Sequence, residues 1–275
     1  MSGTVAADAT AWAGLRALGR DLRLEYRWIA PARRDAPLLV FLHEGLGSAS
    51  MWKDWPERAC DAAGCRGLVY SRYGYGRSTP RPPDEQWPVH FMHDQARDVL
   101  PALLRTLGVD AARDRPVLYG HSDGASIALL YAAMHPEAIA GVVAAAPHIM
   151  VEDVAIASIR QARRAYLETD LPARLARYHA DPGSAFWGWN DIWLDPAFRA
   201  WDIRDYLPRI RCPLLALQGV DDEYGTLEQI RGIRRLAPQT RLLEIPACGH
   251  APHKDQPDTV IAAVADFVGG LSKTG

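Results

Sequence analysis

One short segment has the residue types that activate a serine for attack on a carbonyl carbon. Residues 120–124 read Gly-His-Ser-Asp-Gly, which places Ser122 between two glycines. An apolar run, Val117–Tyr119, precedes the segment, and a run of small residues, Ala125–Ala128, follows it. A serine at a sharp turn from a strand into a helix needs such glycines, because larger side chains would collide there. The pattern therefore predicts that Ser122 is a nucleophile at a helix N-terminus, where negative charge is favoured.

A serine hydroxyl is a weak nucleophile and needs a base that an acid orients. Asp221 and Asp222 directly follow the apolar run Leu214–Leu217. The carboxyl ends of strands in a parallel sheet meet at one edge, so an acid there is expected beside Ser122. The spacing alone leaves both aspartates open as candidates.

The candidate base comes later in the chain. His250 follows a glycine just past the apolar run Leu242–Ile245, and His253 lies one turn onward. Position directly after a strand favours His250, with His253 as the alternative.

Attack by a serine also requires donors for the oxyanion that forms. The backbone N–H of Asp123 is one candidate, because it follows the nucleophile. The loop His43–Gly47, after the apolar run Leu38–Leu42, offers the second. Either Gly45 or Leu46 can supply it, and Gly45 is preferred.

Short apolar runs alternate with longer amphipathic segments, which favours βαβ units and a mostly parallel sheet. Strands are predicted at Leu38–Leu42, Gly67–Tyr70, Val117–Tyr119, Gly141–Ala146, Leu214–Leu217 and Leu242–Ile245, helices at Ser48–Ala63, His90–Leu107, Ala125–Met134 and Pro257–Phe267, and an edge hairpin within Leu15–Ala30. Residues 148–208 contain helical stretches, many aromatics and no convincing strand. The expected architecture is an α/β core of residues 1–147 and 209–275, with residues 148–208 inserted as a helical cap.

The composition argues against several classes of protein. Lys and Arg total 31 against 33 Asp and Glu, so we expect no nucleic-acid or membrane-surface partner. No apolar run reaches the roughly 18 residues of a membrane helix, and Met1–Thr10 lacks the pattern of a secretion signal. The four cysteines form no CxxC pair or zinc spacing, which predicts reduced, mostly buried thiols in a cytoplasmic protein. The protein is expected to be a monomer or a homodimer. No metal or organic cofactor is expected.

These motifs together resemble the α/β-hydrolase superfamily over about residues 20–270. The chain is similar to the capped branch that contains esterases, thioesterases and C–C hydrolases. The resemblance implies an α/β-hydrolase fold, a mostly parallel central sheet flanked by helices. The family's Gly-x-x-Asp turn matches Gly219 and Asp222, so the resemblance favours Asp222 over Asp221. The serine at the nucleophile position argues against dehalogenases and epoxide hydrolases of this fold, which use aspartate.

Two loops depart from the family pattern. The oxyanion loop has Glu44 where the family usually has glycine after histidine. This acid is expected either to be a pocket group with a raised pKa or to turn away and pair with an arginine such as Arg72. The loop Ser71–Ser78 keeps the family's glycines but has Ser71 and Tyr73 in place of its Asp and Arg, which leaves Arg72 or Tyr73 available to the pocket.

The aromatic residues of the expected cap are the candidates for substrate contact. We expect one or two of Trp187, Trp189 and Trp193 to contact substrate together with Glu44, and the others to pack the cap onto the core. Three arginines of the first cap helix are expected mainly to form a solvated helix face, with binding of a carboxylate or of thioester phosphates as the alternative: Arg160, Arg163 and Arg164.

The expected activity is hydrolysis of a carboxylic ester or thioester of a small acyl group, aromatic ones included, through a Ser-His-Asp triad and an acyl-enzyme. The same residues serve C–C bond hydrolysis of a ring-cleavage product, which pocket arginines for a dienoate carboxylate would favour. They are also compatible with transfer of the acyl group to an alcohol, and with a non-catalytic ligand receptor on the same scaffold.

Overall fold

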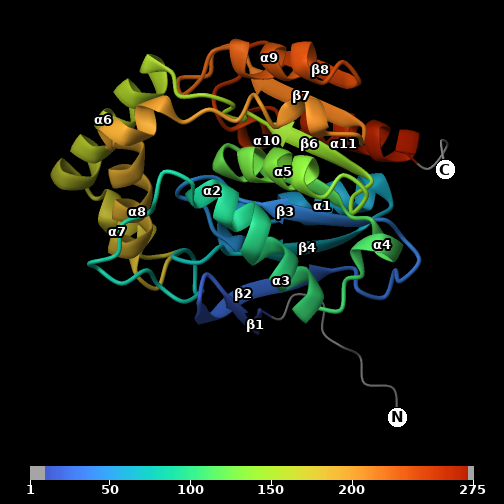
Figure 1. Cartoon of the computed structure of the whole chain (residues 1–275), viewed down its shortest axis with the longest axis horizontal. Coiled ribbons are helices and arrows are strands. Elements are labelled where there is room, and N and C mark those ends of the chain that lie inside the picture. Colours follow the sequence, from blue (N-terminus) through green and yellow to red (C-terminus); the bar gives the residue numbers. More distant parts are fainter. Residues whose placement is uncertain (1–9, 272–275) are drawn as a thin grey trace.

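A computed structural model describes residues 10–271. Its centre is an eight-stranded sheet with the strand order β1-β2-β4-β3-β5-β6-β7-β8 (Figure 1). The pairs β1–β2 and β2–β4 are antiparallel, and the other five neighbouring pairs are parallel. The strands are β1 Ala11–Ala17, β2 Arg20–Ile29, β3 Leu38–Leu42, β4 Arg66–Tyr70, β5 Val117–His121, β6 Gly141–Ala145, β7 Leu214–Gly219 and β8 Thr240–Ile245. The predicted α/β class with a mostly parallel sheet is confirmed.

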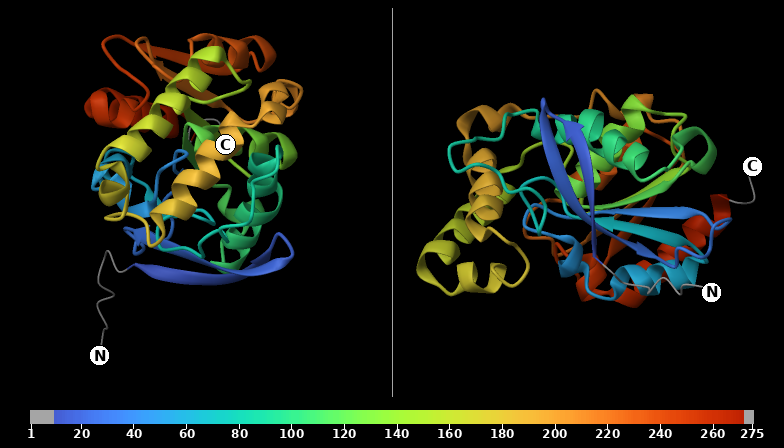
Figure 2. Two further views of the ribbon diagram at one scale, coloured as in Figure 1. Left: turned by 90° about the vertical axis from the view of Figure 1, so that its left-hand side faces the viewer. Right: turned by 90° about the horizontal axis from the view of Figure 1, so that it is seen from below.

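Helices cover both faces of this sheet. Residues of β3, β5 and β6 are buried throughout, as their continuous apolar runs predicted. Side chains on one face of the sheet pack against α1 Trp55–Ala63 and α11 Pro257–Leu271. Those on the other face pack against α2 Phe91–Asp94, α3 Leu100–Thr106 and α5 Asp123–Met134 (Figures 1 and 2).

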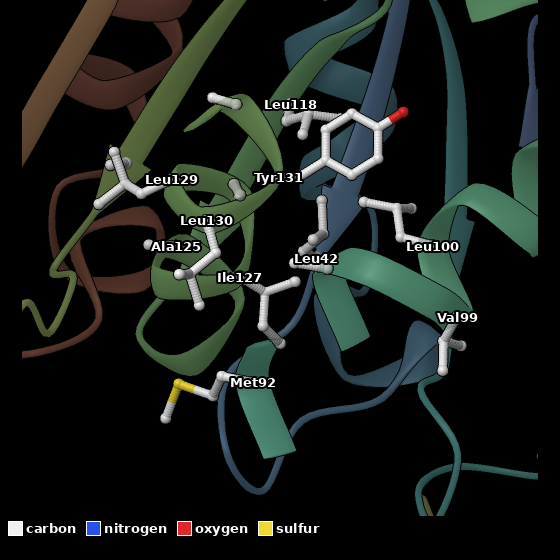
Figure 3. Packing of buried hydrophobic residues seen from close by; sticks show 14 of the residues in the cluster. Leu42, Met92, Val99, Leu100, Leu118, Ala125, Ile127, Leu129, Leu130 and Tyr131 are labelled. Atoms are coloured by element: carbon white, nitrogen blue, oxygen red, sulfur yellow. The ribbon is translucent and has the colours of Figure 1, made fainter. Parts of the chain in front are cut away.

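The helix α5 fixes the position of Ser122, the residue directly before it. All its residues except Met134 are buried, so the helix is enclosed on every side. Its side chains, among them Ile127, pack with Leu42 and Leu118 of the sheet and with Met92 and Leu100 of the neighbouring helices (Figure 3). Because the core holds α5 in place, the turn that precedes its first residue is held as well.

Two predicted helices are interrupted. The segment 48–63 divides into a 3-10 helix, η1 Ala49–Trp52, and α1, because Lys53 between them has a φ of 54°. The segment 90–107 contains a π-helical turn, Gln95–Val99, before α3. Pro101 follows that turn and has no N–H to donate to the preceding helical turn. Three short helices were not predicted: α4 Ala111–Asp114, α9 Glu228–Leu236 and α10 Pro252–Asp255.

Residues 148–208 form helices and no strand of the sheet, as expected. The helices are α6 Asp153–Glu168, α7 Leu171–Leu175 and α8 Pro182–Leu194, followed by the 3-10 helices η3 Pro196–Ala200 and η4 Leu207–Arg209. An isolated bridge pairs Met150 with Asp202 where this segment leaves and rejoins the sheet. In Figure 1, α6, α7 and α8 lie together to the left of the sheet.

Candidate active site

Ser122 lies at the sharp turn from β5 into α5. Its φ is 54° and its ψ is −121°, a conformation that a non-glycine residue rarely adopts. A Cβ atom on Gly120 would collide with the carbonyl oxygen of Gly124, and one on Gly124 with the carbonyl oxygen of Leu42. Both glycines are therefore needed for backbone segments to approach closely around the serine, as the sequence predicted.

Ser122, His250 and Asp222 form one chain of hydrogen bonds in the structure. The Nε2 atom of His250 is 2.9 Å from the Ser122 hydroxyl oxygen, and its Nδ1 is 2.8 Å from Oδ1 of Asp222. Nδ1 faces a carboxylate and so carries the ring proton, which leaves Nε2 free to accept from the serine hydroxyl. This is the arrangement that a serine nucleophile and its base require.

Asp222 is almost fully buried, with 1% of its side chain exposed. Its carboxylate accepts hydrogen bonds from the N–H groups of Tyr224 and Gly225, at 2.8 and 3.2 Å, and from the side-chain amide of Gln218 at 3.0 Å. Burial opposes ionisation of this carboxyl, but the hydrogen bond to His250 and these further bonds outweigh it and hold the pKa of Asp222 below its usual value. The alternative acid, Asp221, is exposed.

The alternative base, His253, is buried away from Ser122. Its ring packs against Trp52, with 4.7 Å between centroids, and against His121 at 4.9 Å. Burial lowers the pKa of His253 well below its usual value. The hydrogen bond to Ser122 comes from His250, so the structure groups His250 and not His253 with Ser122.

The loop expected to supply an oxyanion donor lies beside Ser122. Glu44, Gly45 and Leu46 line the same cavity as the serine. Within residues 10–271, the N–H groups of Gly45 and Leu46 donate to no acceptor, and neither does that of Asp123. The indole of Trp189 covers Gly45 so closely that a Cβ atom there would collide with it. All three predicted donor candidates therefore remain available to a ligand.

The cavity over Ser122 has a volume of about 300 Å³. Trp189 of α8 and Tyr224 form aromatic parts of its wall. Its charged lining residues are Glu44, Glu223, Lys254 and Asp255. Sequence reasoning missed four of these lining residues. Glu223 and Tyr224 directly follow Asp222, and Lys254 and Asp255 follow His250 within five positions.

Two of the three candidate tryptophans lie away from the cavity over Ser122. Trp193 is 1% exposed, and its Nε1 donates to the carboxylate of Asp123 at 3.2 Å, so it belongs to the core beneath the turn. Trp187 lines a different hollow, where Arg163 stacks on it 5.3 Å from the ring centroid. Of the three candidates, Trp189 is the one that lines the cavity over Ser122, and its contact with substrate stays a prediction.

Glu44 lines the cavity, as one expectation had it, but its pKa is not raised and its carboxylate does not pair with Arg72. Its carboxylate lies 3.5 Å from Nδ1 of His121 and 3.6 Å from Nζ of Lys254. Burial disfavours its ionised form, but His121 and Lys254 outweigh burial and hold the pKa of Glu44 well below its usual value. Arg72 donates instead to the backbone carbonyl of Glu44, at 2.9 Å.

Two further histidines surround His250. The Nε2 of His121 lies 2.7 Å from the carbonyl oxygen of His250 and donates to it. The ring of His148 lies 5.7 Å from that of His250, and burial, reinforced by His250, lowers the pKa of His148 to about 3. His148 is therefore neutral at pH 7 and adds no positive charge to the site.

No group of three or more His, Cys, Asp or Glu side chains that could hold a metal ion is found among the residues that the structure describes. In the same part of the chain, no helix is both long and apolar enough to span a membrane.

A family model for the alpha/beta hydrolase family matches residues 39–263. The chain is 27% identical over 272 residues to the bifunctional esterase/perhydrolase DCH of Acinetobacter calcoaceticus, covering 86% of this chain and 92% of that protein. It is 26% identical over 279 residues to the sn-1-specific diacylglycerol lipase ABHD11 of Mus musculus, covering 90% and 86%. A solved thermophilic esterase from Thermogutta terrifontis shares the fold, with a TM-score of 0.74 at 21% identity over 96% of this chain and 99% of that one. The chain therefore belongs to the alpha/beta hydrolase family of enzymes.

Proposed function

We propose that the protein is a serine hydrolase that cleaves a carboxylic ester or thioester through Ser122, His250 and Asp222. The hydrogen-bonded line from Ser122 through His250 to Asp222 carries this proposal. Among relatives, the Acinetobacter protein is named as an esterase, which supports the same class of bond.

The proposed reaction proceeds in two steps. His250 takes the hydroxyl proton of Ser122 as the serine oxygen attacks the carbonyl carbon, and the N–H groups of Asp123 and Gly45 hold the oxyanion. The protonated His250 then donates that proton to the departing alcohol or thiol, which leaves an acyl-enzyme. In the second step His250 activates water, which releases the acid and restores Ser122. Asp222 keeps the imidazole oriented throughout.

The cavity indicates the substrate class. A volume of about 300 Å³ with Trp189 and Tyr224 in the wall suits a small acyl group, aromatic ones included. Three carboxylates, those of Glu44, Glu223 and Asp255, face one lysine, so the lining favours an uncharged substrate over an anionic one. Among the described residues, no arginine lines this cavity, which removes the feature that would favour a dienoate and C–C bond hydrolysis.

Residues 148–208 are proposed to act as a cap on a core of residues 1–147 and 209–275. The support is the position of α8, whose Trp189 lies over Gly45 and in the wall of the cavity. Reduced thiols in the cytoplasm are proposed because all four cysteines are buried and free.

A fluorophosphonate probe with intact-mass measurement tests the proposal. The wild type is expected to gain one adduct, and Ser122→Ala and His250→Ala to gain none at the same dose. Steady turnover of 4-nitrophenyl acetate by the wild type alone completes the expected result. A folded wild type that takes no adduct and turns over no ester contradicts the proposal and favours a ligand receptor.

A further inference from the structure

Arg72 is a fully buried arginine directly behind the candidate oxyanion hole. It follows β4 by two positions, and 1% of its side chain is exposed. Its guanidinium stacks on Tyr75, 4.6 Å from the ring centroid. Burial of a charged group at such a place is unfavourable unless its contacts compensate for the lost water. The groups that Arg72 contacts therefore indicate its role in the site.

The first contact is with the oxyanion loop. Nη2 of Arg72 donates to the carbonyl oxygen of Glu44 at 2.9 Å. That carbonyl and the N–H of Gly45 belong to the same planar peptide group, so holding the oxygen also fixes the direction of the N–H on the opposite side. Gly45 N–H is the donor proposed for the oxyanion.

A second donor acts on the same carbonyl. The backbone N–H of Arg72 donates to Nε2 of His43 at 2.9 Å, which places the ring proton on Nδ1. Nδ1 of His43 in turn donates to the carbonyl of Glu44 at 2.7 Å. Two donors on one carbonyl polarise the peptide group and strengthen its N–H as a donor.

The second contact is with the nucleophile turn. Nη2 of Arg72 is 3.7 Å from Oδ2 of Asp123, and the other oxygen of this carboxylate accepts from Trp193. The backbone N–H of Asp123 is the other proposed oxyanion donor. The guanidinium of Arg72 thus contacts the Glu44–Gly45 peptide, which carries one proposed donor, and the side chain of Asp123, whose backbone carries the other.

We infer that Arg72 is a positioning residue that holds the two oxyanion donors in place, through the Glu44–Gly45 peptide and the side chain of Asp123. This inference rests on the proposed function. A preorganised donor acts on charge that develops only in the transition state, so Arg72 contributes to kcat and hardly to KM.

The test compares Arg72→Met with wild type in kcat and KM for 4-nitrophenyl acetate and in Ki for an aryl trifluoromethyl ketone, which forms a tetrahedral oxyanion on serine. We expect kcat to fall about 100-fold and Ki to rise by a similar factor, while KM changes by less than about 3-fold. Arg72→Lys, which keeps the charge without the planar fork, is expected to lie between the two.

Arg81→Met is the matched control. Arg81 is also buried, at 6% exposure, and its guanidinium donates to backbone carbonyls, including that of Pro82 at 3.0 Å. Among the described residues, its hydrogen-bond partners are Ser184, Pro82 and Glu85, and not the Glu44–Gly45 peptide or Asp123. Its loss is expected to lower the melting temperature and to leave kcat and Ki within about 2-fold of wild type. An equal loss of kcat in both variants would show that removal of any buried arginine suffices, which contradicts the inference.

Arg72→Met leaves Asp123 without its cation, so Arg72→Met combined with Asp123→Asn is the second variant should the first not fold. Its expected kcat loss is at least as large. A folded variant of either kind with kcat and Ki within about 3-fold of wild type overturns the role of Arg72 and leaves the proposed function standing. A wild type that binds no ketone and hydrolyses no ester overturns both.

Discussion

At the scale of single residues, the carboxylate of Asp222 distinguishes itself from its neighbour by its contacts. The side chain of Asp222 is buried and accepts hydrogen bonds from four residues. Asp221 is exposed, and its backbone N–H donates to the carbonyl oxygen of Cys248. Two adjacent acids of the same type thus have opposite environments. Substituting each aspartate in turn therefore compares two residues of the same type at adjacent positions, which differ in burial and in contacts.

Asp222→Asn is expected to lower kcat about 10⁴-fold, because an amide stabilises the wrong imidazole tautomer and no imidazolium. Asp221→Asn is the matched control and is expected to keep kcat within about 2-fold of wild type. Steady-state kinetics with 4-nitrophenyl acetate measures both. Equal losses in the two variants would contradict the assignment of Asp222 as the acid.

The pKa of His148 sets a pH dependence of stability. Its folded pKa of about 3 lies below the usual value of 6.5, so the unfolded chain binds the proton first as pH falls. The contribution of His148 is complete above pH 6.5 and is lost between there and about pH 3, at about 1.4 kcal/mol per pH unit. The ring of His148 packs against Trp193, with 4.8 Å between centroids, and His148→Phe keeps a ring there but removes the titrating group. The unfolding free energy of this variant is therefore expected to fall less steeply from pH 6 to 4. Parallel urea-denaturation curves of the two proteins across this range would contradict the prediction.

At the scale of elements, the sequence predicted best which residues lie together when their position along the backbone alone decides it. Ser122, Asp222 and His250 each follow a predicted strand, and parallel strands bring such positions to one edge. Trp187 and Trp193 depend instead on how α8 docks. Residues 189 and 193 share one helix face, but Trp193 lies deeper, under the serine turn, so only Trp189 reaches the cavity.

Breaks within elements were also beyond the sequence pattern. The apolar periodicity over residues 90–107 continues through the π-helical turn at Gln95–Val99. The spacing of apolar residues does not reveal to which carbonyl oxygen each backbone N–H donates. The contact between Arg72 and the Glu44 carbonyl likewise joins two loops through backbone atoms, which no residue-type pattern reveals.

Gly124→Ala tests the close packing of α5 on the sheet. Alanine suits a helix better than glycine, but here its Cβ would collide with backbone atoms of Leu42 and His43. We expect a loss of about 3 kcal/mol in unfolding free energy, together with loss of fluorophosphonate labelling. Gly269→Ala in α11 is the matched control, because nothing lies within 4 Å of its Cβ position, and a gain of about 0.5–1 kcal/mol is expected. Thermal and urea unfolding measure both, and equal effects would contradict the prediction.

At the scale of the whole molecule, the cavity has one wall from the core and one from residues 148–208. Gly45 and Tyr224 belong to the first, and Trp189 belongs to the second. The space over Ser122, in which the acyl group is proposed to bind, therefore depends on how residues 148–208 rest on the sheet edge. Sequence reasoning predicted that such a segment exists but not which of its faces meets the core.

Trp189→Leu is expected to enlarge the cavity above Gly45. The ratio of kcat/KM for 4-nitrophenyl octanoate to that for the acetate is expected to rise about 10-fold, because the indole no longer limits chain length. Trp187→Leu, in a hollow apart from Ser122, should leave the ratio unchanged. An unchanged ratio in both variants would show that Trp189 does not limit the acyl group.

The hydrogen bond between Ser122 and His250 joins positions 128 residues apart in the chain. Between these two positions the chain forms β6, β7 and β8, and β5 to β8 are consecutive neighbours in the sheet. Contacts of such long sequence separation form late, after the entropy of closing large loops has been overcome. Covalent labelling of Ser122 during refolding is therefore expected to report molecules in which β5 to β8 have paired, and not molecules that have only collapsed.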